Sequence, residues 1–211
     1  RTGRMFFTID GGDGTGKSTQ ISLLSQWLRD RGQPVVTCRD PGSTRLGEAI
    51  RDLVLHRHDL AITRRSEMLL YMASRAQLVE EVIRPALARG ETVVCDRFLL
   101  ANVVYQGHAG GLAAEELWEV GRIATGGVLP DLTMVLDMPT EAATARLQRP
   151  LDRMEQQGAG FHVQVRDGFL KEARRRPEQV VVIDADRPID VVQADLRAAV
   201  ERSLSSSGES P

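Results

Sequence analysis

Short apolar runs alternate with longer segments of helical periodicity along most of the chain. The apolar runs are five or six residues long, and the longer segments carry apolar residues three and four positions apart. Strands that alternate with helices in this way are typical of a parallel sheet covered on both faces. The pattern predicts an α/β fold with five parallel strands, at residues 5–10, 34–38, 92–96, 132–137 and 180–184.

Helix ends and interruptions divide the chain further. The helix predicted after the first strand should end at Gly32, because glycine suits the residue that follows a helix. Residues 64–89 have helical periodicity, but Pro85 should kink or break that helix. Helical spacing also fails between residues 149 and 161 and then resumes as far as Arg176.

The domain organisation follows from these features. We expect a single domain over residues 5–204, with a mobile charged lid at about 149–160. The ending SSSGESP is small and polar, so residues 205–211 should form a disordered tail.

Composition and charge narrow the possible partners. The net charge of −2 argues against nonspecific binding to nucleic acid. The first apolar run is interrupted at once by glycines, so it is too short for a signal sequence or a membrane span. Cys38 and Cys95 lie in apolar runs and are expected to be buried and unpaired, as in a reducing compartment. We therefore expect a cytoplasmic protein.

A glycine-rich stretch, DGGDGTGKSTQ, lies between the first predicted strand and the first predicted helix. It fits G-x-x-x-x-G-K-[ST], in which glycines let backbone N–H groups turn toward a polyphosphate at a helix N-terminus. Lys17 is one of two lysines, against 25 arginines, and its compact ammonium suits the β and γ phosphates. A chance match would not explain the flanking strand and helix. The stretch predicts nucleoside triphosphate binding by Gly11, Gly12, Asp13, Gly14, Thr15, Gly16, Lys17, Ser18 and Thr19.

A metal site would complete this phosphate site. The Ser18 hydroxyl could bind Mg²⁺ directly, and Asp96, at the end of the strand TVVCD, could hold it through water. Arg97 follows and could meet a phosphate. An acid at a strand end is more often a helix cap, so Asp96 alone is a weak signal.

Tyr71 and Arg75 are candidates for binding a planar base. They are four residues apart in YMASR and therefore share one face of the predicted helix. The alternative is a core aromatic residue beside a surface arginine. The sequence lacks the N-K-x-D signature of guanine binding, which disfavours a GTPase.

Six segments together resemble the thymidylate kinase family. They occur in the family's order and are DGGDGTGKSTQ, RDPGSTRLGEAIR, YMASRAQLVEEVIRPAL, DRFLLANVVYQG, PDLTMVLDMPTEAATARL and LDRMEQ. The resemblance implies a P-loop nucleoside monophosphate kinase-like fold with a short lid. It also implies transfer of the γ-phosphoryl group of ATP to dTMP, with Mg²⁺, in a homodimer.

The resemblance implies roles for residues near the reacting phosphates. Asp13 matches a carboxylate near the deoxyribose 3′-hydroxyl, and Arg39 and Arg97 match a clamp on the acceptor phosphate. With Lys17, Asp13 and Arg97 are expected to be catalytic. A phosphate monoester is already an anionic nucleophile, so alignment and charge neutralisation suffice and no general base is needed.

The resemblance also implies residues that bind the thymidine part of dTMP. Tyr71 matches the aromatic residue that stacks on the base, and Arg75 matches the arginine that donates to a thymine carbonyl. Asn102 lies where some members read the N3 edge, and Tyr105 matches the tyrosine against the sugar. Gln106 is counted with these substrate-binding residues.

Arginines around the lid are the remaining catalytic candidates. Some family members carry an arginine inside the P-loop, but GDGTG has none here, so the lid should supply the charge. Arg146 is expected to bind ATP, and Arg149 and Arg153 are expected to be catalytic, with Arg153 contributing most. The alternative is a solvated basic face.

Some residues depart from the family pattern and leave room for other functions. Asp10 and Asp40 stand where relatives usually have glutamate, Ser43 replaces a glycine, and Ala101 replaces a common serine. The alternative enzymes are a deoxynucleoside kinase or another nucleoside monophosphate kinase. A nucleotide-binding regulatory switch is a more remote alternative. For the expected enzyme, activity should decrease from dTMP to dUMP and be negligible with dCMP.

Overall fold

The centre of the molecule is a five-stranded parallel sheet. In the computed structural model, which describes residues 4–147 and 152–206, the strand order is β2-β3-β1-β4-β5. The strands are β1 Phe6–Gly11, β2 Val35–Arg39, β3 Thr92–Asp96, β4 Leu132–Asp137 and β5 Val180–Asp184. The sheet confirms the expected α/β fold. β1 and β2 each lie one residue later than the pattern predicts, and the other three agree with it.

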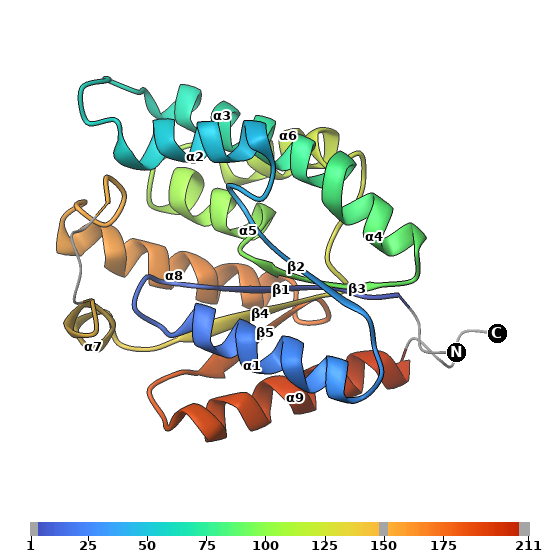
Figure 1. Ribbon diagram of the computed structural model, residues 1–211. Coiled ribbons are helices and arrows are strands. Elements are labelled where there is room, and N and C mark those ends of the chain that lie inside the picture. The colour runs from blue at the N-terminus through green and yellow to red at the C-terminus, as the bar shows by residue number, and fades with distance from the viewer. Residues whose placement is uncertain (1–3, 148–151, 207–211) are drawn as a thin grey trace.

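Helices cover both faces of this sheet (Figure 1). Helices α1 and α9 pack on one face, and α4, α5 and α8 pack on the other, with α2, α3 and α6 outside them. The α-helices are α1 Lys17–Asp30, α2 Arg45–His56, α3 Arg64–Leu78, α4 Arg84–Ala88, α5 Leu99–Asn102, α6 Ala114–Ala124, α7 Thr140–Ala145, α8 Ala159–Arg175 and α9 Ile189–Ser206. None of the helices in the described ranges is long and apolar enough to cross a membrane.

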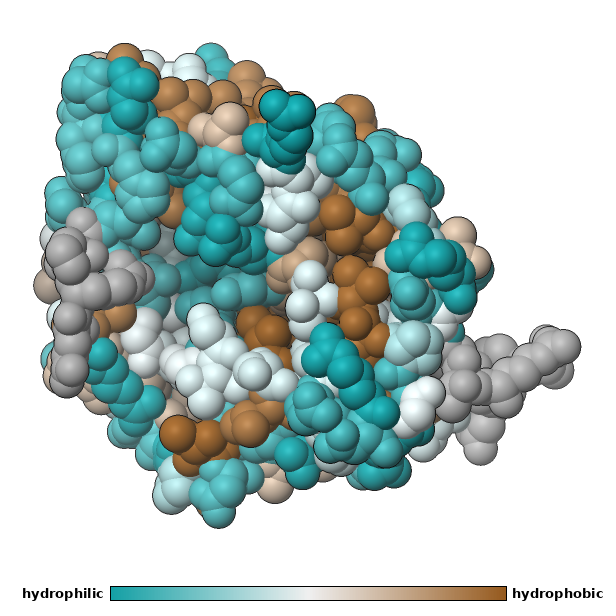
Figure 2. Space-filling model, in the orientation of Figure 1, coloured by the Kyte–Doolittle hydropathy of each residue, from teal (hydrophilic) through white to brown (hydrophobic). Residues whose placement is uncertain are grey.

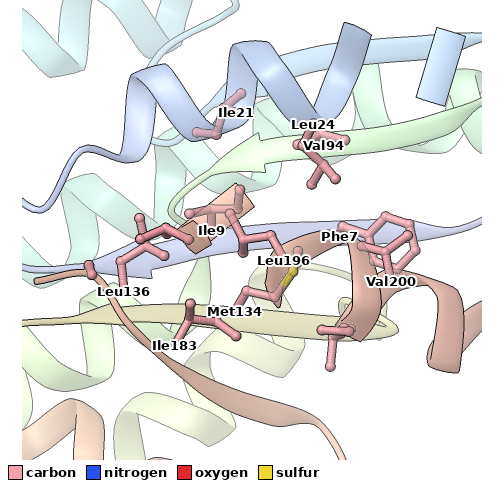
Figure 3. Close-up of a cluster of buried hydrophobic side chains, with 14 of the residues drawn as sticks. Phe7, Ile9, Ile21, Leu24, Val94, Met134, Leu136, Ile183, Leu196 and Val200 are labelled. Carbon is pink, nitrogen blue, oxygen red and sulfur yellow. The ribbon is translucent and has the colours of Figure 1, made fainter. Parts of the chain in front are cut away.

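Alternation along β1 builds two hydrophobic cores. Phe7 and Ile9 point toward α1 and α9, where they meet Leu24, Met134 and Leu196 (Figure 3). Phe6, one residue before Phe7 and so on the other side of the strand, packs in a separate cluster on the opposite face. Because both faces are covered, β1 is buried along its whole length, including its polar residues Thr8 and Asp10.

The long helix predicted over residues 64–89 is interrupted as expected, but the interruption begins before the proline. α3 ends at Leu78, a π-helical segment η1 spans Val79–Ile83, and Pro85 lies in the first turn of α4. Proline has no N–H, so Pro85 cannot donate a hydrogen bond to a carbonyl oxygen of the preceding turn. A π-helical turn before Pro85 changes the hydrogen-bond pattern there and leaves fewer carbonyl oxygens unpaired. A second π-helical segment, η2 Val103–His108, follows α5.

The remaining boundary predictions fall partly outside the described residues. Helix α1 ends before Gly32, which has a left-handed φ of 76°, as predicted. Helical structure resumes at α8 and ends at Arg175. Arg149 and residues 207–211 lie outside the described residues, and α9 includes residues 205 and 206 of the predicted tail.

Candidate active site

The glycine-rich loop joins the carboxyl end of β1 to the N-terminus of α1. Its tight course needs glycine at two points. A Cβ at Gly11 would lie 2.4 Å from the Leu136 carbonyl oxygen, and one at Gly14 would lie 2.0 Å from the Ala143 carbonyl oxygen. Both residues also have a positive φ that disfavours other side chains. The loop is therefore held between β4 and α7, with its backbone close to the start of α1.

Lys17 bridges this loop from the first turn of α1. Its Nζ donates to the carbonyl oxygens of Gly12 at 2.6 Å and Gly11 at 3.3 Å, and lies 3.8 Å from Asp13 Oδ1. Burial, together with the nearby charge of Arg97, lowers the pKa of Lys17 to about 8. The Lys17 ammonium group thus contacts neutral carbonyl oxygens of the loop. A bound polyphosphate would place negative charge beside it.

Asp13, Arg97 and Tyr105 form a cluster at the mouth of the loop. Arg97 donates to Asp13 Oδ1 at 2.5 Å and to the Gly11 carbonyl oxygen at 2.8 Å, and Tyr105 Oη donates to Asp13 Oδ2 at 3.2 Å. Burial would raise the pKa of Asp13, but Arg97 and Lys17 outweigh it and lower the pKa to about 2. Arg97 has a left-handed φ of 65°, a strained conformation of the kind found at functional sites.

A cavity of about 780 Å³ joins the loop to the candidate base-binding residues. Figure 2 shows a hollow bordered by hydrophilic residues on this face of the molecule. Tyr71 and Arg75 both line it. Arg75 is almost fully buried, so it is not the surface arginine of the alternative interpretation. Its Nε donates to Asp40 Oδ2 at 2.6 Å and its Nη1 donates to Asn102 Oδ1 at 3.0 Å.

Arg39 and a second arginine line the same cavity from β2 and α2. Arg39 is half exposed and pairs with Glu48 at 2.8 Å. Ser43 Oγ accepts a hydrogen bond from the Arg39 backbone N–H at 2.9 Å. Ser43 has a left-handed φ of 63°, which explains why glycine would suit this position. Arg51 donates to the Pro41 carbonyl oxygen at 3.0 Å and also lines the cavity. The sequence interpretation did not assign a role to Arg51, although it lies in the quoted segment RDPGSTRLGEAIR.

The other end of the cavity lies between α7 and the start of α9. Thr19 and Arg146 line it there, with Arg146 Nη1 3.5 Å from the Ala185 carbonyl oxygen. Arg187 and Ile189 line the same region. Sequence analysis missed these two residues, because the segment DADRPID has no local pattern that indicates a ligand.

Arg153 packs against α2 and α3 and is not among the residues that line the cavity. Its Nε donates to the Val54 carbonyl oxygen at 2.7 Å, and its Nη2 contacts the buried carboxylate of Glu67. Its backbone N–H also donates to the Leu55 carbonyl oxygen at 3.1 Å. The structure therefore brings Arg153 to α2 and α3, whereas the sequence interpretation directs it toward the transferred phosphate.

The residues that could hold Mg²⁺ lie in the first turn of α1 and at the carboxyl ends of β1 and β3. Ser18 lines the cavity, and Asp96 lines it too, with a buried Oδ1 that has no hydrogen-bond partner among the described residues. Both oxygens of Asp10 are likewise unpartnered there. Spare carboxylate oxygens suit a hydrated cation. Within the described residues, no group of three or more acidic, cysteine or histidine side chains is placed to hold a metal by itself.

The fold and cavity define a P-loop kinase of the nucleoside monophosphate kinase type, with one region for a triphosphate and another for an acceptor. The family model for thymidylate kinase matches residues 9–196. The thymidylate kinase of Rhodopirellula baltica is 47% identical over 194 residues, covering 92% of this chain and 78% of that protein. That of Thermosipho africanus is 44% identical and covers 96% and 100%, respectively. The crystal structure of thymidylate kinase from Ehrlichia chaffeensis has a TM-score of 0.78 at 28% identity, covering 94% of this chain and 99% of that one. The chain belongs to the thymidylate kinase family.

Proposed function

We propose that the protein transfers the γ-phosphoryl group of ATP to dTMP, giving ADP and dTDP. The observation that carries this proposal is the single cavity that contains the glycine-rich loop at one end and Tyr71, Arg75 and Asn102 at the other. Its volume of about 780 Å³ lies in the upper part of the usual range for ligand sites. Two nucleotides placed in it would meet with their phosphates at the centre.

The donor phosphates would lie against the loop. Backbone N–H groups and the α1 N-terminus favour negative charge there, and Lys17 Nζ is close enough to leave its loop carbonyl partners for a phosphate. Arg146, with Arg187 and Ile189, would hold the nucleoside end of ATP. Ser18 and Asp96 would hold Mg²⁺, Asp96 through water. When bound, the metal neutralises phosphate charge.

The acceptor phosphate would lie between Arg39 and Arg97. Arg51 supports the same charge from α2. Arg97 is held by Asp13 and by the Gly11 carbonyl oxygen, so its guanidinium is oriented before a ligand arrives. The dianionic phosphate of dTMP then attacks in line without losing a proton, and positioning with charge neutralisation carries the catalysis.

Thymine would stack on Tyr71 and accept a hydrogen bond from Arg75, while Asn102 and Gln106 face its N3 edge. Tyr105 would lie against the sugar. Arg149 and Arg153 stay candidates for charge delivery to the transferred group. Arg153→Ala should lower kcat. Near-normal kcat in this variant, with a loss in Arg149→Ala, would assign the role to Arg149.

The test is ADP formation with a panel of acceptors. We expect rates in the order dTMP, then dUMP, with negligible rates for dCMP and for thymidine. Equal ADP release without any acceptor would favour a regulatory nucleotide switch, and a preference for thymidine would favour a nucleoside kinase.

Assembly and location are separate proposals. We propose a homodimer, to be tested by sedimentation equilibrium. We also propose that it works in the cytoplasm, where reduced thiols agree with the free, buried Cys38 and Cys95. Fractionation of the source cells tests this location.

A further inference from the structure

A chain of buried polar side chains connects the lid to the base-binding residues. Arg153 contacts Glu67 Oε2, and Gln106 Nε2 donates to Glu67 Oε1 at 2.8 Å. Asn102 Nδ2 then donates to Gln106 Oε1 at 2.7 Å, and Arg75 Nη1 donates to Asn102 Oδ1 at 3.0 Å. These hydrogen bonds run without a gap from Glu67 on α3, through η2 and then α5, to Arg75 on α3.

The two ends of this chain have a fixed chemical polarity. A carboxylate that contacts two guanidinium groups, those of Arg64 and Arg153, can only accept hydrogen bonds. Arg75, at the other end, can only donate. An amide has a donor side and an acceptor side that are nearly equal in shape, so packing alone does not orient it. Between an acceptor-only end and a donor-only end, one orientation of Gln106 and Asn102 satisfies every group.

The orientation of these amides decides which base the cavity accepts. Thymine presents an N3–H donor beside carbonyl acceptors, whereas cytosine presents an N3 acceptor beside an amino donor. Gln106 and Asn102 both line the cavity, and each retains one N–H and one oxygen lone pair after making the bonds of the chain. Reversing an amide would exchange the positions of these spare groups and place donor against donor for thymine.

We propose that Glu67 is a positioning residue that makes the enzyme select thymine over cytosine, because it fixes the polarity of Gln106 and, through it, of Asn102. This inference rests on the proposed function. Glu67 is fully buried and is not among the residues that line the cavity, so it would act through Gln106 rather than by touching dTMP.

The burial of Glu67 argues that its charge serves more than packing. A buried carboxylate is expensive unless it is paired. Here it is paired with Arg153 and Arg64, whose side chains are 17% and 33% exposed. Because both arginines reach solvent, a neutral glutamine at position 67 would leave no guanidinium fully buried and unpaired. Glu67→Gln should therefore fold while removing the fixed polarity at this end of the chain.

The experiment compares Glu67→Gln with Glu80→Gln. The control carboxylate lies on η1, is largely exposed and pairs with Arg84. We expect Glu67→Gln to raise the KM for dTMP and to lower the ratio of kcat/KM for dTMP to that for dCMP about tenfold or more, since a hydrogen bond to a charged group contributes at least that much. The KM for ATP should change less than threefold, and Glu80→Gln should match the wild type.

Several outcomes decide the proposal. An unchanged dTMP to dCMP ratio in folded Glu67→Gln would overturn it, even if the variant were less stable, since a purely structural role lowers stability without altering base selectivity. If Glu67→Gln does not fold, the Gln106→Met variant tests the proposal instead. If that variant still preferred dTMP over dCMP as the wild type does, the proposal would also be overturned, because the Gln106 amide would not be needed. A wild-type enzyme that releases no ADP with dTMP would instead refute the proposed function itself.

Discussion

Asp10 should lower the stability of the folded protein, and the effect should grow with pH. The residue is fully buried at the end of β1, and neither carboxylate oxygen has a hydrogen-bond partner among the described residues. Burial raises its pKa from 3.8 to about 7, although Arg97 and Lys17 partly offset this. Between these two pKa values the folded protein binds more protons than the unfolded chain, so the free energy of unfolding falls as the pH rises.

The magnitude follows from the two pKa values of Asp10. They differ by about three units, and each unit corresponds to about 1.4 kcal/mol. At pH 8 the carboxyl group therefore lowers the free energy of unfolding by about 4 kcal/mol relative to a neutral group of the same shape, and at pH 5 by about 2 kcal/mol. Asp10→Asn, which keeps the shape, should raise the free energy of unfolding by about these amounts.

Urea unfolding followed by circular dichroism between pH 5 and pH 8 measures this effect. Asp30→Asn, at an exposed position on α1, is the control for a lost charge and should show no comparable gain. The same Asp10→Asn protein should phosphorylate dTMP more slowly, because the Asp10 carboxyl group interacts electrostatically with Arg97 and Lys17 of the proposed phosphate site. A gain that is equal at pH 5 and pH 8 would refute the assignment of a raised pKa to this buried carboxyl group.

Three further changes test other contacts. Lys17→Met should lower kcat at least about 10²-fold at saturating substrates, because the phosphates lose their ammonium partner; wild-type turnover would contradict this role. Gly14→Ala should lower the free energy of unfolding, measured in urea, by more than about 2 kcal/mol, since the new Cβ would lie 2.0 Å from the Ala143 carbonyl oxygen. As a control, Gly158→Ala should change the free energy of unfolding by less than about 0.5 kcal/mol, because there is open space around Gly158. Arg75→Leu should raise the KM for dTMP at least about tenfold and leave the KM for ATP unchanged, as initial rates can show.

The features that the sequence predicts well are those with a short-range physical cause. Parallel strands that are covered on both faces need apolar residues almost throughout, and the five runs therefore locate the sheet to within one residue. The glycine-rich loop is recognised from a local motif, in which Lys17 contacts the Gly12 carbonyl oxygen. The close approaches that require glycine at positions 11 and 14 come from β4 and α7, and the sequence does not show them. By contrast, Cys38 and Cys95 are distant in the sequence but lie opposite each other on the neighbouring strands β2 and β3. Only the strand order reveals that they are neighbours.

Long-range contacts were the part that the sequence interpretation missed. Glu67 is four residues before Tyr71, which is four before Arg75, so the face that predicts base binding also contains this acid. That signal was present and overlooked. The docking of Arg153 on Glu67 had no comparable signal, because it depends on the path of an irregular segment. The π-helical turns likewise have no distinctive residue period.

The arrangement of the site should lower the stability of the fold. Parallel strands end at one edge of the sheet, so the glycine-rich loop after β1, Arg39 at the end of β2 and Arg97 after β3 converge without any long connection. The same geometry also brings Asp10 and Asp96 to that edge, where three of their buried carboxylate oxygens have no hydrogen-bond partner in the part of the chain that the structure describes. Apolar residues there would stabilise the sheet but could not bind phosphates or a hydrated cation. Strain at Arg97 and unpaired charge at Asp10 are therefore consequences of keeping the site ready for two anionic nucleotides.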